Sequence, residues 1–448
     1  MTLALRATGS HPSQTPASSL SRIGKLIVAL AAPVTALNAI LPHIGPVSAY
    51  SAYAALMFVY GILHMRRRPP SSLRRTVLLL CIPLLAVALS ATAFNLDDPR
   101  AFAESVVVSG GLMITLGFIA LPSTRETARA VLTGWLIASL ATTILAVIEL
   151  TTGRHFGATY LDANPGASKT GVVTVFYNPN NYAAFLTLTI PLLIAGAALA
   201  VRPWVRRVYY VAALVSVPVM IATSSRFGVA ALVLGSAVWL VLKIRSHLAQ
   251  AFVLAFALIG VVLVFRFLQD RSAGEISGVS ANADEAIRIF GVTVTSDPSL
   301  VARWNLMLNG FDMIGAAPFG AGPSGYEKIA QAQGTSRMTF GMINPHNGAV
   351  EFIVQYGVIF GILAMIVTIA LFANALRVNS ALPKGAPERA FAAATACLIA
   401  VLPLIFSMHS TFVNVPHEWV GFATITSVGV ALFRAQPTST PDTPAPDA

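Results

Sequence analysis

The chain has 448 residues, of which 56% are hydrophobic and only 10% are charged, and its mean hydropathy is +0.73. Because soluble proteins carry roughly 25% charged residues, this composition excludes a soluble globular protein. The net charge of +11 comes mainly from basic residues in loops between apolar segments. Such a distribution reports membrane topology and does not indicate a nucleic-acid partner.

Apolar segments long enough to cross the roughly 30 Å hydrocarbon layer as helices recur along the whole chain. They are continuously apolar and not alternating, which excludes a transmembrane β-barrel. The predicted fold is therefore an all-α polytopic membrane protein with about twelve transmembrane helices. The segments lie near residues 24–41, 46–64, 76–94, 102–121, 129–150, 181–201, 208–223, 226–242, 248–268, 347–376, 390–409 and 416–433.

Polar stretches divide the chain into five predicted parts. Residues 1–23 and the Pro/Thr/Ala-rich residues 436–448 are expected to be disordered cytoplasmic ends. Residues 24–268 are predicted to form a bundle of about nine transmembrane helices, and residues 347–435 to add the C-terminal ones. The long polar interval 269–346 between them is predicted to be an extracytoplasmic loop region with short helices.

The basic residues also predict the orientation in the membrane. Placing the N-terminus in the cytoplasm puts 19 of the 29 lysines and arginines, with only four acidic residues, on the inner side, giving +15 there and −4 outside. Cytoplasmic loops carry such an excess of Lys and Arg. We therefore expect a multi-pass plasma-membrane protein with both termini in the cytoplasm and an extracytoplasmic site. Group transfer on that side needs a donor that is already activated.

Arg226 is the only charged residue between Arg207 and Lys243. This stretch of 35 residues is too long for one span, so Thr223-Ser224-Ser225 is predicted to form a tight outer turn and helix N-cap. Arg226 would then lie in the first turn of the next helix. Charged residues at membrane depth are costly and usually functional. The alternative is an arginine that only reaches the lipid headgroups.

Arg303 lies in a predicted helix over 299–314 that we expect to cross the mouth of the bundle. At about 100° per residue, Arg303 falls beside the apolar stripe and would point inward. The alternative is an interfacial arginine beside Trp304. The stripe consists of Leu300, Trp304, Met307, Leu308, Phe311 and Ile314.

His346 stands where the last polar interval meets an apolar segment. Asn344 can cap a helix and Pro345 fits its first position, which would place His346 and Asn347 in the first helical turn. A neutral imidazole there can accept a proton from an attacking hydroxyl. The alternative is a histidine with a capping or structural role.

Polar residues also mark the helices that would surround this site. Asn347, Glu351 and Gln355 recur every four residues, and such a stripe must face the protein interior or a wet cavity. Asn178-Pro179-Asn180-Asn181 opens another apolar segment from the same side, and helix N-termini are ready anion sites. Arginines, helix N-termini and one histidine thus converge on one face, where a lipid-linked diphosphate is the expected anion.

Cys81 and Cys397 lie inside apolar segments and far apart in the sequence. They predict no disulfide and no metal site. We expect no cofactor.

These motifs resemble those of the O-antigen ligase and polymerase family, multi-pass inverting glycosyltransferases of the outer leaflet with a C-type glycosyltransferase architecture. The resemblance spans about residues 170–376 and rests on the order, spacing and common side of the motifs. They are Asn178-Pro179-Asn180-Asn181, Ser225-Arg226, Arg303-Trp304, Pro318-Phe319-Gly320-Ala321-Gly322, and His346-Asn347 followed by Glu351 and Gly357.

The resemblance implies metal-independent transfer of a glycan from an undecaprenyl-diphosphate carrier to an acceptor hydroxyl. Arg226 and Arg303 would bind the diphosphate, and His346 would act as general base or position the acceptor. The supporting residues would be Asn347, Glu351, Asn180 and Asn181. The implied partners are the lipid-linked donor, a glycan, lipid or protein acceptor, and membrane lipids.

Two questions remain open at this point. A transporter or flippase of surface glycan or lipid is the alternative function, because polar residues at membrane depth can mark a transport path. The concentration of polar motifs on one face disfavours it, since alternating access needs a site reachable from both sides. Ligase and polymerase are not distinguished, because they share the donor and differ only in the acceptor.

Overall fold

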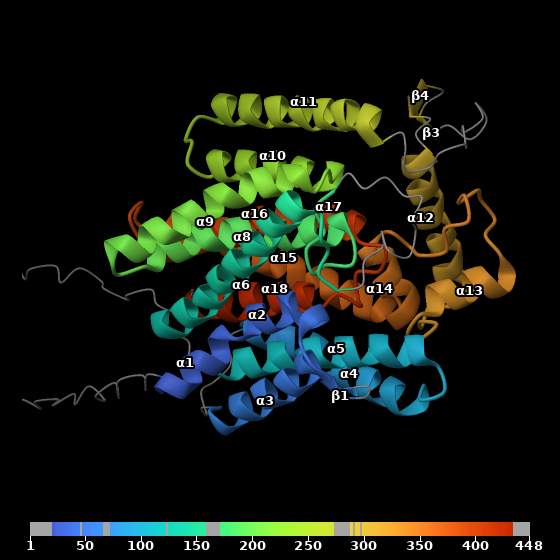
Figure 1. Ribbon diagram of the computed structural model, residues 1–448, viewed down its shortest axis with the longest axis horizontal. Helices are drawn as coiled ribbons and strands as arrows, with labels where there is room; N and C mark the ends of the chain where they lie inside the picture. Colours follow the sequence, from blue (N-terminus) through green and yellow to red (C-terminus); the bar gives the residue numbers. More distant parts are fainter. Residues whose placement is uncertain are drawn as a thin grey trace, which may run out of the picture.

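A computed structural model shows a bundle of long helices that run side by side, with α12 standing across one end (Figure 1). The predicted disordered ends lie almost wholly outside the described residues, although α1 already begins at Arg22. The described residues are 20–44, 47–65, 72–121, 124–157, 171–272, 287–289, 292–295 and 298–432.

Helices make up almost all of the regular structure. The first group comprises α1 (Arg22–Ala29), α2 (Ala31–Ala36), η1 (Asn38–Ile40), α3 (Ala49–Leu63), α4 (Ser72–Phe94), α5 (Pro99–Ala120), α6 (Arg125–Thr152), α8 (Pro179–Leu199), α9 (Pro203–Ala222), α10 (Arg226–Val241) and α11 (His247–Ser272). The second comprises α12 (Pro298–Ala316), α13 (Gly325–Gln333), α14 (Gly348–Tyr356), α15 (Val358–Ala381), α16 (Pro387–Ala400), α17 (Leu402–Met408) and α18 (Pro416–Leu432). Two short antiparallel pairs join β1 (His43–Ile44) to β2 (Val47–Ser48) and β3 (Ile287–Ile289) to β4 (Val292–Thr295).

The all-α polytopic class is confirmed, whereas the count of twelve spans is not. Within the described ranges, seven helices are long and apolar enough to cross a membrane, namely α4, α5, α6, α8, α9, α11 and α15. The pair α16 and α17 is bent by 54° and gives up to eight spans if it counts as one. The shorter apolar helices α3 and α10 have 15 and 16 residues.

Breaks within the apolar segments, together with the short helices, account for this difference. The first predicted span is divided into α1, α2 and a 3-10 turn. The segment 347–376 is interrupted at Gly357, whose φ of +90° separates α14 from α15. The predicted turn after α9 is confirmed, because Ser225 caps α10 by accepting a hydrogen bond from the N–H of Gly228.

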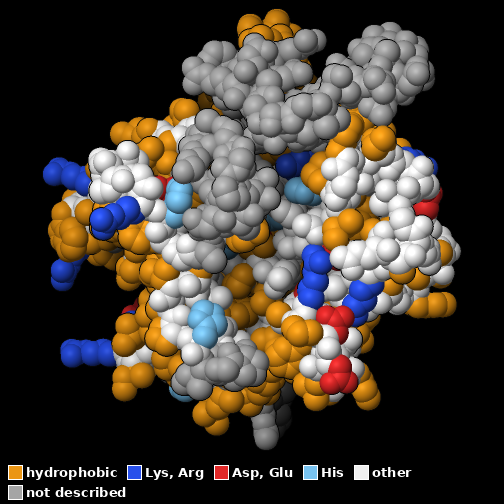
Figure 2. All heavy atoms as spheres, turned by 45° about the vertical axis from the view of Figure 1, so that its right-hand side comes forward, with side chains coloured by type: hydrophobic (Ala, Val, Ile, Leu, Met, Phe, Trp, Pro, Cys, Tyr) orange, Lys and Arg blue, Asp and Glu red, His pale blue; other side chains and the backbone are white. Residues whose placement is uncertain are grey.

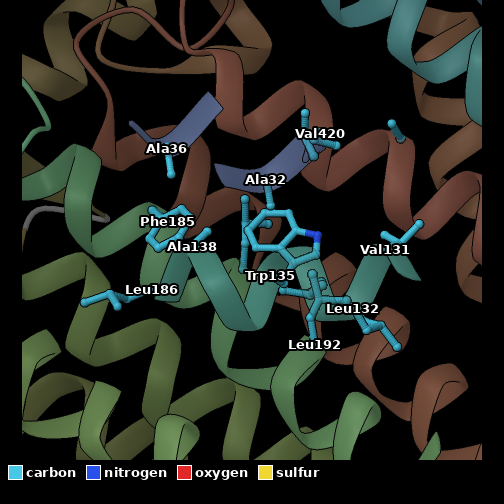
Figure 3. Packing of buried hydrophobic residues seen from close by; sticks show 14 of the residues in the cluster. Ala32, Ala36, Val131, Leu132, Trp135, Ala138, Phe185, Leu186, Leu192 and Val420 are labelled. Carbon is cyan, nitrogen blue, oxygen red and sulfur yellow. The ribbon is translucent and has the colours of Figure 1, made fainter. Parts of the chain in front are cut away.

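The centre of the bundle is packed around Trp135 of α6 (Figure 3). Its ring is fully buried and stacks 5.7 Å from the ring of Phe185 in α8. Its Nε1 donates a 3.0 Å hydrogen bond to Thr424 of α18, which satisfies the indole N–H that burial removes from water. Helices from the N-terminal, middle and C-terminal parts of the chain are thereby joined.

The outer helices expose the apolar side chains that a lipid-facing surface requires. α8 is almost entirely buried, whereas α11, at the edge of the bundle in Figure 1, is almost entirely exposed. Figure 2 turns the end that carries α12 toward the reader, and hydrophobic side chains there surround a face with basic, acidic and histidine side chains. The surface thus combines an apolar belt with one more polar end.

The charge distribution and this fold together predict the side on which α12 and α13 lie. Cysteine at position 333, in α13, should react with a membrane-impermeant maleimide in intact cells. Cysteine at position 384, between α15 and α16, should react only after the cells are permeabilised. Both Gln333 and Lys384 are exposed, and the native Cys81 and Cys397 are buried, so background labelling should be low. The opposite labelling pattern would show that the predicted orientation is wrong.

Candidate functional site

Several helix ends meet at the end of the bundle that α12 crosses (Figure 1). The short connection between α17 and α18 forms the centre of this region. We call residues 407–415, from the last turn of α17 to the start of α18, the α17–α18 corner. The N-termini of α8, α10 and α14 are linked to it by the contacts described below.

Arg303 reaches the corner from α12. Its guanidinium donates a hydrogen bond from Nη1 to the backbone carbonyl of Ser407. The same guanidinium lies over the ring of Phe227, with Cζ 5.3 Å from the ring centroid. Since Phe227 follows Arg226 at the start of α10, the structure brings Arg303 beside the residue next to Arg226. Both arginines are half-buried.

The predicted crossing helix exists as α12, but the predicted apolar stripe is not its buried face. Trp304 and Phe311 are 42% and 52% exposed, whereas Asn309 is buried. Asn309 can be buried because its Oδ1 accepts hydrogen bonds from the side chains of Ser336 and Arg337. The small residues Ala302 and Gly310 lie on the buried side, where Gly310 packs against Val350 of α14.

His346 lies just before α14 and not in its first turn, so that prediction was wrong. The N-cap is Asn347, whose side chain accepts hydrogen bonds from the N–H groups of Ala349 and Val350. His346 itself has a φ of +48°, and its N–H donates a 3.1 Å hydrogen bond to the carbonyl of Ser410 in the corner. A non-glycine residue in this left-handed conformation costs about 1–3 kcal/mol, and such residues are concentrated at functional sites.

Asn344 does not cap the helix either. Its Oδ1 accepts a 3.0 Å hydrogen bond from Nη2 of Arg100, at the start of α5. The same nitrogen lies 3.0 Å from Oε1 of Glu327 in α13. Burial raises the pKa of Glu327, and the Arg100 guanidinium opposes this rise. Arg100 therefore ties α5 to both α13 and the segment before His346.

The imidazole of His346 is suited to accept a proton. Its Nδ1 is buried and has no hydrogen-bond partner within the described residues. Burial, above all, and the charge of Arg303 hold the pKa of His346 well below its usual value of 6.5. The ring is therefore neutral near pH 7 and has a free lone pair.

The predicted polar stripe of α14 faces the interior. Glu351 and Gln355 are buried, and Asn347 provides the cap. Oε2 of Glu351 accepts hydrogen bonds from the backbone N–H groups of Phe412 and Val413. A carboxylate on α14 thereby holds the second half of the α17–α18 corner.

Of the two asparagines predicted at the start of α8, Asn180 and Asn181, one contacts the α17–α18 corner. Asn178 caps the helix by accepting a hydrogen bond from the N–H of Asn181, as the Asn-Pro motif predicts. Oδ1 of Asn181 lies 2.9 Å from Nδ1 of His409. The side chain of Asn180 makes no hydrogen bond within the parts of the chain that are described, so Asn181 alone is linked to the corner.

Three residues of this region were not predicted from the sequence. His409, His417 and Glu418 are all buried, and Nε2 of His409 lies 2.9 Å from Oε1 of Glu418. The available signal was a polar break between the last two apolar segments that is flanked by two histidines and a glutamate. The sequence does not show that this break packs on α8, 228 positions away.

The glycine-rich segment 318–323 supports the break between α14 and α15. The N–H groups of Ala321 and Gly322 donate to the carbonyls of Val354 and Gln355. A Cβ on Gly320 would lie 2.6 Å from the carbonyl oxygen of Gln355, and one on Gly357 would lie 2.6 Å from the backbone of Phe319. Both glycines also have positive φ values, so this contact requires glycine on both sides.

An apolar cavity of about 450 Å³ begins beside the site. It lies between α14, α15, α16, α17 and α18, and its lining includes Gly348, two residues after His346, and Phe406, which precedes Ser407. Among its lining residues are Gly348, Phe352, Gly361, Phe406, Phe412 and Trp419. A smaller cavity of about 180 Å³ lies away from these residues, between α8, α9, α10 and α16.

Comparison with known protein families gives a match over the part of the chain that contains the candidate site. Residues 211–366 match the family model described as O-antigen ligase. No curated protein matches the chain. The match includes Arg226, Arg303 and His346, and it supports a ligase- or polymerase-type role in surface polysaccharide biosynthesis. The predicted resemblance to the O-antigen ligase and polymerase family is thereby confirmed over residues 211–366.

Proposed function

We propose that this protein transfers a glycan from an undecaprenyl-diphosphate carrier to an acceptor hydroxyl at the extracytoplasmic face of the membrane. The observation that carries this proposal is the meeting of Arg303, the start of α10 and His346 at the α17–α18 corner. Cationic groups, a neutral base and an apolar cavity are thus adjacent, which is the combination that a lipid-linked diphosphate donor needs.

Arg226 and Arg303 are proposed to bind the diphosphate. A guanidinium can donate two parallel hydrogen bonds to phosphate oxygens, and the N-terminus of α10 adds its partial positive charge. When the bond between the anomeric carbon and the phosphate oxygen breaks, negative charge grows on that oxygen. The two arginines would stabilise this charge, and such electrostatic stabilisation is usually the largest catalytic contribution.

His346 is proposed to activate the acceptor. Its Nε2 would accept the proton of the acceptor hydroxyl while the hydroxyl oxygen bonds to the anomeric carbon. The electron pair of the broken glycosidic bond leaves with the lipid diphosphate. Attack from the side opposite the leaving group inverts the configuration at that carbon. The depressed pKa of His346 supports this role, because only the neutral ring can accept the proton.

The apolar cavity is proposed to hold the first part of the polyprenyl chain. Its walls are almost entirely apolar, and it begins next to the residues that would hold the diphosphate. Burial of apolar surface contributes about 25 cal/mol per Å², so a bound chain adds affinity without any specific polar contact. The headgroup would then be anchored at a fixed depth below α12.

The acceptor decides between a ligase and a polymerase, and analysis of glycans from a deletion strain separates the two. Loss of long chains with single repeat units retained indicates a polymerase. Accumulation of complete lipid-linked polymer that is not attached to any acceptor indicates a ligase.

Substitution of Arg226 tests the diphosphate role. We expect Arg226→Ala to reduce transfer on the order of 10²- to 10³-fold, the loss typical of removing one charge-stabilising donor. Arg226→Lys should restore little activity, because an ammonium group cannot replace the bidentate fork. Transfer of labelled glycan in membrane vesicles, normalised to protein level, measures both. The exposed Arg245, beyond the other end of α10, gives the control Arg245→Ala. Full activity of the lysine variant would contradict the role.

The pH profile tests the base role of His346. Because the pKa of His346 is lowered, the neutral base is present throughout the neutral range. We expect kcat/KM to stay level around pH 7 and to fall only on the acidic side, below pH 6.5. Arg303→Gln removes a nearby cation and should move this acidic limb to higher pH, measured on its residual activity. Arg303→Lys keeps the charge and should leave the limb in place. Identical limbs in both variants would argue against the base role.

A further inference from the structure

The two ends of the α17–α18 corner carry three side chains with metal-binding atoms. One ring nitrogen each of His409 and His417 and a carboxylate oxygen of Glu418 all lie within 4.8 Å of one another. Oε1 of Glu418 is 2.9 Å from Nε2 of His409 and 3.7 Å from Nε2 of His417. The three side chains are at most 4% exposed, so they are not a solvated surface cluster.

Asn181 orients both imidazoles toward the carboxylate. Its side-chain Oδ1 lies 2.9 Å from Nδ1 of His409, and its backbone carbonyl accepts a hydrogen bond from the ring of His417. Because Nε2 of His417 has no partner within the described ranges, the bonded atom of that ring is Nδ1. With the hydrogen of each ring on Nδ1, both rings present the lone pair of Nε2 to Glu418. Metal-binding histidines are fixed in this way by an oxygen acceptor behind the ring.

We propose that His409, His417 and Glu418 bind one divalent metal ion, and that the ligand set favours Zn²⁺. Two imidazoles and one carboxylate form an established zinc ligand set that leaves a fourth position for water. With ligands at about 2.0–2.2 Å in tetrahedral geometry, neighbouring ligand atoms lie about 3.3–3.6 Å apart. The two separations from Oε1 of Glu418, 2.9 and 3.7 Å, bracket this spacing, and the ligand nitrogens of the two rings lie within 4.8 Å of each other.

A metal ion also gives the buried ring nitrogens of His409 and His417 partners that the hydrogen bonds among these side chains do not provide. Without an ion, Nε2 of His417 is buried and unpartnered in the described structure, and such an atom costs about 1–3 kcal/mol. Without an ion, His409 lies between Oδ1 of Asn181 and Oε1 of Glu418 and can donate to both only as a buried imidazolium. One ion satisfies both rings and the carboxylate together.

The role of this metal would be to fix the corner. It would join the end of α17 to the start of α18 across residues 409–418, and Asn181 would connect it to α8. The carbonyls of Ser407 and Ser410, which receive Arg303 and His346, belong to the same corner. The site requires no chemical step at the metal and stands independently of the proposed glycan transfer. It departs from the sequence-based expectation of no metal.

Metal content of the purified full-length protein tests this proposal. The protein, with a histidine-free affinity tag and in lipid nanodiscs, is incubated with Zn²⁺, dialysed against metal-free buffer and measured by inductively coupled plasma mass spectrometry. We expect one zinc ion per chain in the wild type and background levels in His417→Gln and Glu418→Gln. His155→Gln is the matched control, because His155 pairs with Glu149 elsewhere in the fold and should retain the zinc.

Cobalt substitution tests the ligands separately from zinc retention. Co²⁺ in a tetrahedral or five-coordinate site with nitrogen ligands gives strong visible d–d absorption, which should appear in the wild type and in His155→Gln. It should be absent in His417→Gln even where that variant elutes as a monodisperse protein. Background zinc in the wild type, or wild-type zinc content and cobalt spectrum in His417→Gln, would overturn the proposal.

Discussion

The contact on which the site depends joins the side-chain carboxyl group of Glu351 to the backbone of the α17–α18 corner. Oε2 of Glu351 accepts hydrogen bonds from the N–H groups of Phe412 and Val413. These groups lie in the connection between α17 and α18, outside both helices, and buried N–H groups need a partner. A single buried side chain on α14 thereby fixes the corner relative to the helix that His346 precedes.

The corner in turn gathers residues that are far apart in the sequence. Its carbonyls at Ser407 and Ser410 receive Arg303 and the backbone of His346, and its first residue after α17, His409, contacts α8. Helix N-termini that point to one end of a bundle supply partial positive charge but do not place individual side chains. In this protein the backbone of one short connection places these side chains. A polar break between two apolar segments is therefore needed at 409–415.

Local rules in the sequence predicted features whose cause is local. The turn at Ser225, the Asn178 cap and the interior position of Glu351 follow from capping and from the cost of polar groups among lipids. The position of His346 was wrong because Asn344 and Asn347 can both cap a helix. Which asparagine caps α14 depends on contacts with distant residues: Asn344 bonds to Arg100, and His346 bonds to Ser410. Such contacts leave no periodic trace in the sequence.

Hydrogen exchange of the corner tests the central claim, that Glu351 positions the site through backbone contacts. In Glu351→Ala, amides of residues 409–415 should exchange faster by mass spectrometry, and glycan transfer should fall in parallel. Glu149→Ala provides the control, because Glu149 holds the N–H groups of Val173 and Thr174 elsewhere and should leave the corner unchanged. Unchanged exchange at 409–415 in Glu351→Ala, or fast exchange there with full transfer activity, would contradict the account.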